Sequence, residues 1–193
     1  MQFTYAKGAT PLSPDEIYNL IPKHLTKQHQ LDEWEQYNIA RAEMWIKNHK
    51  INDILSIDFY KKLHSRMFCD TWVWAGKFRK KETNIGVNSV YIQQELKILI
   101  DDVIFWQTNA TFPFREIGVR LHHRLVFIHP FLNGNGRFSR LLADLYILNL
   151  NEPRFSWGSN NLIQESSFRD RYLQALRTAD NGDYSPLIEF ADS

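Results

Sequence analysis

Apolar residues recur every three or four positions along most of the chain, which is the spacing of one face of an α-helix. This spacing predicts amphipathic helices from Leu31 to Ile46 and, after Ser56, from Ile57 to Phe68. It returns from Leu96 to Ile104, and again from Pro113 toward His129. We therefore expect an all-α fold, a bundle of packed helices.

Shorter helices are predicted near both ends of the chain. Ser13-Pro14-Asp15-Glu16 has the residues of a capping box with proline in the first turn, and predicts a helix to about Leu20 that Pro22 ends. The segments Leu162–Ala179 and Pro186–Phe190 predict two more helices.

The segment Trp74–Tyr91 interrupts the helical rhythm. It contains Gly76 and Gly86, and Ile85, Val87 and Tyr91 alternate about small polar residues. The pattern predicts a loop with a small β-hairpin. A basic run precedes this hairpin, made of Lys77, Arg79, Lys80 and Lys81. We expect a solvated flank, with attraction of an acidic target as the alternative.

Composition narrows the class of protein. With 193 residues, 44% of them hydrophobic, the chain can form one globular domain. Residues 1–30 would form an N-terminal arm with a short helix, and residues 31–193 a helical core with a flap near 77–91. The 23 Lys plus Arg and 22 Asp plus Glu give a formal charge of +1, so no nucleic-acid partner is expected. A single cysteine, Cys69, and no signal or membrane-spanning pattern predict a cytoplasmic protein.

The richest chemistry lies between two predicted helices, Ile117–Ile128 and Phe138–Leu150, that are apolar on most faces and expected at the centre of the bundle. Pro130 predicts the end of the first helix at His129, and two glycines permit a tight turn into a helix near Arg137. Backbone N–H groups at such a start bind anions. The string reads His129-Pro130-Phe131-Leu132-Asn133-Gly134-Asn135-Gly136-Arg137-Phe138-Ser139-Arg140.

Charge and proton chemistry point to a phosphate chain as the ligand of this turn. Arg137 and Arg140 lie three positions apart, so both guanidinium groups can reach one polyanion. His129 would stand at the rim, where a neutral imidazole takes a proton from a hydroxyl. A general base supplies about 10² to 10⁴ in rate, so fixed charge around the phosphates must supply more. Phe131 is expected to bury its ring and hold the loop.

The string resembles the Fic family signature H-P-F-x-(D/E)-G-N-G-R-x-x-R at every fixed position except the fifth. Ala75–Arg79 followed by Asn84–Val87 is similar to the flap region of Fic/DOC proteins, and Leu121–Ile128 to the segment before the signature. With Thr10–Leu12 and Leu31–Ile39, the whole chain resembles the Fic subgroup called mobile mystery protein B.

The resemblance implies transfer of AMP from ATP, with Mg²⁺, to an exposed Ser, Thr or Tyr hydroxyl of a target protein. It implies that His129 is the base and that Arg137 and Arg140 bind the outer phosphates. The other nucleotide-binding positions that it implies are Asn133, Gly134, Asn135 and Gly136. The flap residues that would dock the target by strand addition are Asn84, Ile85, Gly86, Val87 and Tyr91.

Asn133 is the departure from the signature, because most active relatives have Asp or Glu there to hold Mg²⁺. Mg²⁺ prefers carboxylate oxygens, and Asn133 offers only a neutral carbonyl oxygen. Weaker metal binding is expected, with the ion held mainly by the nucleotide. Three hypotheses stay open: adenylylation of a protein, transfer of another phosphate-linked group such as phosphoryl or phosphocholine, and a non-catalytic nucleotide-binding or partner-binding module, for example one under antitoxin control.

Two other polar features have competing interpretations. Glu35 lies where self-inhibiting relatives carry the glutamate of S/T-x-x-x-E-G/N, although Leu31 and Gln36 depart from that motif. It is either an inhibitory contact of the second motif arginine or a solvated surface carboxylate. His122 and His123, with the motif histidine, could suggest a metal cluster. Because no Cys or carboxylate completes a zinc spacing, a packing role is favoured.

Overall fold

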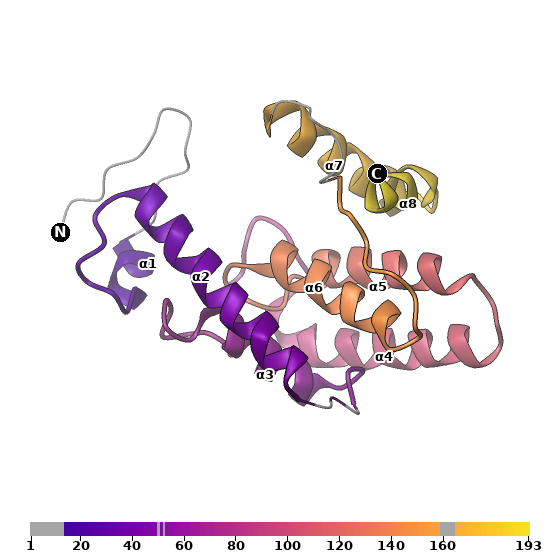
Figure 1. Ribbon diagram of the computed structural model, residues 1–193, viewed down its shortest axis with the longest axis horizontal. Helices are drawn as coiled ribbons and strands as arrows, with labels where there is room; N and C mark the ends of the chain where they lie inside the picture. Colours follow the sequence, from indigo (N-terminus) through magenta and orange to yellow (C-terminus); the bar gives the residue numbers. More distant parts are fainter. Residues whose placement is uncertain (1–13, 50, 52, 159–164) are drawn as a thin grey trace. The chain divides into compact units, whose positions relative to one another are not determined.

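The structure, a computed structural model, describes residues 14–49, 51, 53–158 and 165–193. The described residues form helices and no β-strand, so the all-α fold class is confirmed (Figure 1). The predicted cap Ser13, the segment Thr10–Leu12 and the predicted helix start at Leu162 lie outside the described residues. The helices are α1 (Pro14–Asn19), α2 (Gln28–Lys47), α3 (Ile57–Phe68), η1 (Ser89–Tyr91), α4 (Ile92–Thr108), α5 (Phe114–Ile128), α6 (Asn135–Leu148), α7 (Glu165–Asp180) and α8 (Ser185–Asp192).

The chain divides into two compact units. The first unit comprises residues up to Arg79 together with Phe131–Asn133, and the second comprises Lys80–Pro130 together with Gly134–Ser193. In the first unit α2 packs against α3. As the sequence predicted, α3 starts after Ser56, whose hydroxyl accepts a hydrogen bond from the Phe59 backbone N–H at 3.2 Å.

Backbone pairing ties the start of the first unit to the segment that follows α3. Leu20 and Trp72 form an isolated antiparallel bridge. The Ile21 N–H donates to the Thr71 carbonyl at 2.8 Å, on the same stretch of chain. Leu20 and Trp72 are each 1% exposed, so their apolar side chains shield this backbone pairing from water.

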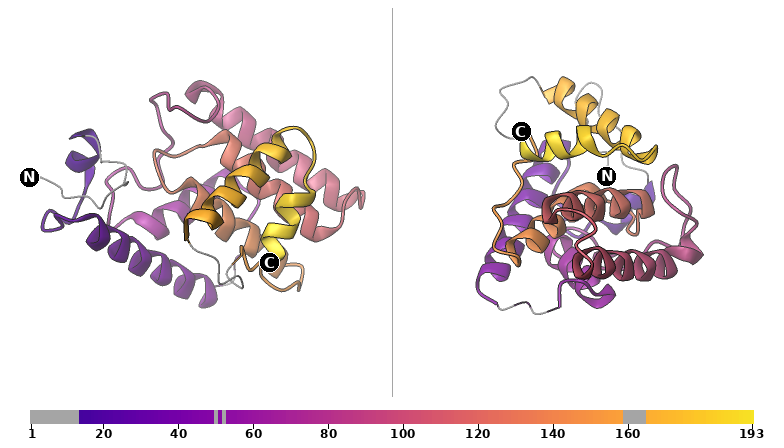
Figure 2. Two further views of the ribbon diagram at one scale, coloured as in Figure 1. Left: turned by 90° about the horizontal axis from the view of Figure 1, so that it is seen from above. Right: turned by 90° about the vertical axis from the view of Figure 1, so that its right-hand side faces the viewer.

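The second unit is built around α5 and α6, which pack against each other. Ten of the fourteen residues of α6 are buried, as expected for a helix at the centre of a bundle. The helices α4 and α8 pack against α5, and α7 pairs with α8, the yellow pair in Figure 2. Of the two helices that flank the motif, α5 is therefore packed against α4, α6 and α8, and α6 is mostly buried.

The small hairpin predicted between residues 77 and 91 is wrong. This stretch, described in full, is an irregular loop that ends in the turn η1. Its closure comes from a side chain: the Glu82 carboxylate accepts from the Ser89 backbone N–H at 3.0 Å and from the Ser89 hydroxyl at 2.7 Å. Ile85 and Tyr91 are more than half exposed, so their alternation in sequence does not reflect a buried strand face.

The start of α6 also corrects a sequence expectation. The helix begins at Asn135, not near Arg137, and Gly136 is already helical.

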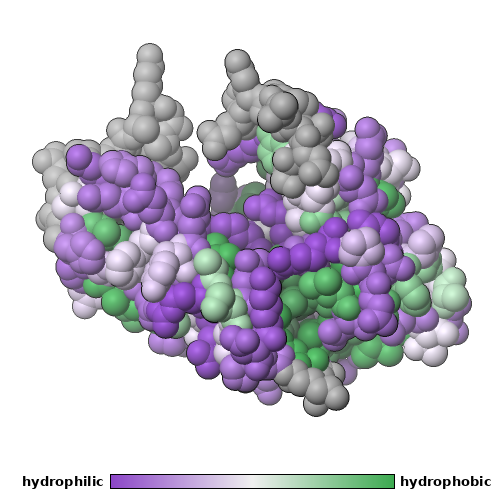
Figure 3. All heavy atoms as spheres, in the orientation of Figure 1, coloured by the Kyte–Doolittle hydropathy of each residue, from purple (hydrophilic) through white to green (hydrophobic). Residues whose placement is uncertain are grey.

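Hydrophilic side chains cover most of the face drawn in Figure 3. Within the described residues, no helix combines the length and apolar character needed to cross a bilayer.

Candidate functional site

The candidate base lies directly after the last residue of α5. His129 is the C-terminal cap of this helix, with φ 53° and ψ 60°, and its N–H donates to the Leu125 carbonyl at 3.0 Å. The left-handed conformation ends the helix before Pro130, as predicted, and costs a non-glycine residue about 1–3 kcal/mol. The residue is half-buried, so its imidazole is neither sealed in the core nor fully solvated.

The start of α6 is formed by residues without bulky side chains. Gly134 caps it with φ 76°, a conformation that suits glycine, and its carbonyl accepts the first helical hydrogen bond from the Phe138 N–H at 2.9 Å. Asn135 follows and is 2% exposed. No acidic residue occupies the first turn of α6, so the positive end of the helix dipole is not offset by a local carboxylate.

The two motif arginines stand on the first two turns of α6. Both are half-buried. Arg140 is four residues after Gly136 and therefore lies on the same helix face, while Arg137 lies on the turn between them. This arrangement brings two positive charges and a helix N-terminus together, which is the chemistry of a polyanion site.

The loop before α6 is fixed by a residue that the sequence analysis missed. Phe131 is fully buried, and its ring stacks on His64 of α3 with centroids 3.7 Å apart. The His64 Nδ1 accepts from the Gly76 N–H at 3.0 Å, so its Nε2 carries the proton and donates to the Asn133 carbonyl at 3.1 Å. One buried imidazole thus holds the motif loop and the chain at Gly76.

Gly76 itself permits this close approach. It has φ 77°, and a Cβ placed on it would lie 2.8 Å from the Lys61 carbonyl oxygen and 2.8 Å from the Ser65 Cβ. Any other residue would therefore push the backbone away from α3. His64 belongs to no recognisable sequence motif. Because Asn133 lies 69 residues away, no local pattern in the sequence indicates that the two residues make contact.

A backbone hydrogen bond joins the predicted flap, near Val87, to the end of α5. The Val87 N–H donates to the Ile128 carbonyl at 3.3 Å, directly beside His129. The other predicted docking residues, Asn84, Ile85, Gly86 and Tyr91, are exposed. The structure therefore brings the middle of the predicted flap to the end of α5.

The histidines before the motif make packing contacts. His122 is fully buried, with Nε2 3.0 Å from the Tyr172 hydroxyl, and His123 has Nε2 2.9 Å from an Asp180 carboxylate oxygen. Burial, together with the charge of Arg140, lowers the pKa of His122 well below the ordinary value of 6.5. In the described part of the chain, no three His, Cys, Asp or Glu side chains are arranged to hold a metal ion.

Glu35 is not a solvated surface carboxylate, so that interpretation is wrong. It is 5% exposed and accepts a hydrogen bond from the Trp72 indole N–H at 2.7 Å. The partner is 37 residues away, which is why helical spacing alone placed the side chain in solvent. Its predicted contact with Arg140 stays a prediction.

The basic run is only partly solvated. Lys77, Lys80 and Lys81 are exposed, but Arg79 is 2% exposed. The expectation of a solvated flank is therefore wrong at Arg79. Because its side chain is buried, Arg79 belongs to the interior and cannot help to attract an acidic target. A buried guanidinium requires polar partners.

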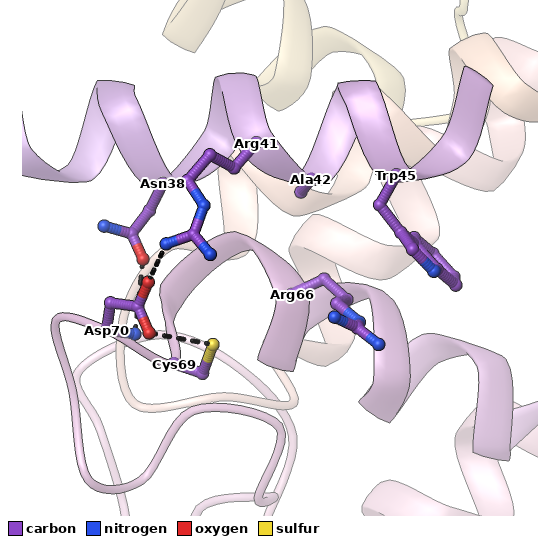
Figure 4. Close-up of a pocket in the computed structure, with 7 residues that line it drawn as sticks. All are labelled: Asn38, Arg41, Ala42, Trp45, Arg66, Cys69 and Asp70. Carbon is purple, nitrogen blue, oxygen red and sulfur yellow. Dashed lines mark hydrogen bonds and ion pairs between the residues drawn. The ribbon is translucent and has the colours of Figure 1, made fainter. Parts of the chain in front are cut away.

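A pocket of about 170 Å³ between α2 and α3 contains none of the predicted site residues. Figure 4 shows Asp70 at its edge, bonded to Arg41 and to the Asn38 side chain. Burial and the neighbouring Asp70 raise the pKa of the Cys69 thiol, so it stays protonated near neutral pH. The lining includes Asn38, Arg41, Ala42, Trp45, Arg66, Cys69 and Asp70.

Sequence comparison relates this geometry to known proteins. The Fic/DOC family model matches residues 54–147. Protein adenylyltransferase fic-1 of Caenorhabditis elegans is 29% identical over 146 residues, which cover 73% of this chain and 27% of the relative. Protein adenylyltransferase Fic of Culex quinquefasciatus is 30% identical over 144 residues, covering 72% and 27%. The chain spans little more than a quarter of the length of these relatives.

Solved structures share the fold. Fic-1 of C. elegans superposes with a TM-score of 0.65 at 25% identity, covering 80% of this chain and 46% of that one. BepC of Bartonella tribocorum, solved with bound AMPPNP, gives a TM-score of 0.70 over 97% and 93% of the two chains, and at 16% identity this likeness concerns the fold alone.

The chain folds into packed helices, and the loop His129–Gly134 connects the two buried helices α5 and α6. This architecture matches the fold of Fic structures. The chain contains a domain of the Fic/DOC family, and the motif His129–Arg140 lies within the matched residues.

The first prediction concerns His64. Replacing it with alanine removes a stacked ring and two hydrogen bonds, and should lower the free energy of unfolding by about 2–4 kcal/mol. The exposed His29→Ala variant should unfold like wild type in the same urea titration. Equal midpoints for wild type and His64→Ala would contradict the anchoring role.

The second prediction concerns pH. Because the folded-state pKa of His122 lies below its unfolded value, the unfolded chain binds more protons as pH falls. The stability contribution is complete above about pH 6.5 and is lost below it, by at most about 1.4 kcal/mol per pH unit. Denaturation between pH 7.5 and 5 should show a shallower loss for His122→Gln than for wild type or His29→Gln. A slope that His122→Gln leaves unchanged would refute this.

Proposed function

We propose that this protein transfers AMP from ATP to a Ser, Thr or Tyr hydroxyl of a target protein. One observation carries the proposal: a strained, half-buried histidine ends α5, and six residues later a glycine-capped helix start presents two arginines. The adenylyltransferase names of relatives that cover over 70% of this chain support the same reaction. We further propose that residues 1–193 act as one Fic-type domain.

In this proposal the start of α6 binds the nucleotide phosphates. Asn135 and the amides of Gly134 and Gly136 hold the α-phosphate, and Arg137 and Arg140 bind the outer phosphates. Electrostatic support of this kind supplies most of the rate in phosphoryl chemistry, because the charges are fixed before the reaction begins. ATP is the substrate whose phosphates these groups would bind.

His129 is the general base. It takes the proton of the target hydroxyl, whose oxygen forms a bond to the α-phosphorus while the bond from that phosphorus to the bridging oxygen breaks. Pyrophosphate leaves, and the AMP group stays on the protein hydroxyl. A half-buried neutral imidazole suits this step, because it can reach both the target and bulk water.

The flap loop docks the target. Its Val87 is bonded to Ile128, the neighbour of His129, so a segment bound along Asn84–Tyr91 lies next to the base. Without a preformed strand, an extended target pairs with an irregular loop edge, and the exposed Ile85 and Tyr91 side chains supply apolar contacts.

Magnesium fits this chain only weakly. No carboxylate stands at position 133, and the described residues hold no group of three metal-ligating side chains. Asn133 would contribute one neutral oxygen, and the nucleotide phosphates would supply the charged ligands; a bound ion would neutralise phosphate charge.

Position 133 is also the observation that favours a second candidate function, transfer of another phosphate-linked group. Membership of the mobile mystery protein B subgroup, an antitoxin partner and self-inhibition through Glu35 are further proposals of the same kind. A buried, hydrogen-bonded Glu35 supports the last of these, because such a carboxylate is held in a fixed position.

The third prediction tests the transferred group. Intact-mass analysis after incubation with each nucleoside triphosphate and Mg²⁺ should show addition of AMP to the protein itself or to a target. His129→Ala should lose at least about 10²-fold of this rate, since it removes the base. Asn133→Asp should give the same product at lower Mg²⁺.

The outcomes separate the candidates. Addition of a different mass would move the assignment to the second candidate function. Absence of any addition by wild type, with ATP still bound, would leave a nucleotide-binding module. Labelling that His129→Ala does not slow would contradict the role of the base.

The fourth prediction tests the phosphate site. A Cβ on Gly136 meets only the Tyr172 hydroxyl, at 4.0 Å, so Gly136→Ala should fold with unchanged or slightly higher stability. Close approach of phosphate to the backbone should nevertheless make it bind ATP at least about tenfold more weakly.

Gly182→Ala is the control for this prediction, because it should have the opposite effects on stability and on ATP binding. Gly182 has φ 91°, so alanine there should cost about 1 kcal/mol of stability while ATP binding by calorimetry stays at the wild-type value. Wild-type affinity in Gly136→Ala would place the phosphates elsewhere.

A further inference from the structure

A tyrosine outside the family match stands beside the second motif arginine. Tyr172 lies on α7, beyond the matched residues 54–147. The guanidinium carbon of Arg140 is 5.6 Å from the centroid of its ring. The Tyr172 hydroxyl oxygen is also 4.0 Å from the place where Gly136 would carry a Cβ. Arg140, Tyr172 and the first turn of α6 therefore meet at one point.

Helix geometry explains this meeting. Arg140 is four residues after Gly136, and side chains on a helix lean toward its N-terminus, so the arginine extends over the turn that begins at Gly136. Because Gly136 has no side chain, the space beside this turn is open toward the Tyr172 hydroxyl.

Tyr172 is held rigidly from several sides. Its hydroxyl lies 3.0 Å from Nε2 of His122, a fully buried residue of α5. Its ring packs against Phe190 of α8 with centroids 5.4 Å apart. His122 in turn lies 4.5 Å from the Trp157 ring, whose indole N–H donates to an Asp144 carboxylate oxygen at 2.9 Å. These contacts hold the phenol beside Arg140.

The charges of the group favour an anion at this point. Burial raises the pKa of Tyr172, although Arg140 opposes the shift, and burial lowers the pKa of His122. Both partners are therefore neutral at pH 7, and neither neutralises the charge of Arg140. An aromatic face and a phenol oxygen hold a guanidinium while leaving its charge available to a ligand.

We propose that Tyr172 is a positioning residue that fixes Arg140 over the first turn of α6 for the outer phosphates of a nucleoside triphosphate. The proposal rests on the proposed function. Because the arginine is ordered before the ligand arrives, binding loses less side-chain freedom, and the gain applies only to ligands that carry phosphates beyond the first.

The chain contains a matched control for this residue. Tyr184 has partners of the same kind. Its hydroxyl lies 3.1 Å from Nδ1 of His123, the residue after His122 on α5, and the Arg120 guanidinium carbon lies 4.0 Å from its ring centroid. Arg120 is not a motif residue. Tyr184→Phe therefore removes an equivalent hydroxyl without touching Arg140.

The fifth prediction compares ATP and AMP binding by calorimetry with Mg²⁺ present. Tyr172→Phe should weaken ATP binding about two- to tenfold, because it removes the hydrogen bond to His122 that holds the ring beside Arg140, and raise KM for ATP with kcat nearly unchanged. AMP binding should not change. Tyr184→Phe should match wild type with both ligands, and in an Arg140→Ala background Tyr172→Phe should have no further effect.

Three results would overturn the inference. Wild-type ATP affinity in Tyr172→Phe would remove the positioning role while leaving the proposed function intact. Equal weakening of ATP and AMP would indicate a general structural role, which thermal unfolding of the same samples would register. If wild type bound neither nucleotide, the proposed function itself would fall, and this inference with it.

Discussion

Two buried helices, α5 and α6, are joined by only the six residues 129–134, and every group of the site depends on that short connection. The chain leaves α5 through a left-handed His129 and enters α6 through a left-handed Gly134. Burial of both helices stabilises this arrangement against the strain at His129. The proposed base and the proposed phosphate site are therefore set by core packing and not by a mobile loop.

Side chains far away in the sequence complete the site. His64 uses both ring nitrogens to hold the Asn133 carbonyl and the Gly76 N–H, and its ring supports Phe131. At the other end of the motif, Tyr172 lies against Arg140. The first contact fixes backbone and the second orders a charged side chain, and ordering before binding is what makes electrostatic support effective.

Much of the fold could be predicted from local sequence. Helical spacing located α2 to α6, and Pro130 marked the end of α5 correctly, because periodicity and proline chemistry act within one turn. The hairpin failed because a side-chain contact, Glu82 to Ser89, closes the flap loop where a β-ladder was expected. Alternating apolar residues describe a strand only when one face is buried.

The candidate site shows the same division. The motif between His129 and Arg140 was readable because its residues are contiguous. Glu35, His64 and Tyr172 could not be assigned from sequence, since their partners lie 37, 69 and 50 residues away and no spacing rule connects them. Tertiary packing decided that Glu35 is buried and that His64 supports the loop.

The most direct test of the account is a crystal structure of the protein with a non-hydrolysable ATP analogue. The account predicts that the phosphates lie against the backbone N–H groups of Gly134–Gly136, with both motif arginines on the outer phosphates and the His129 imidazole facing the α-phosphorus. Phosphates bound away from the start of α6, or an imidazole turned from them, would contradict it.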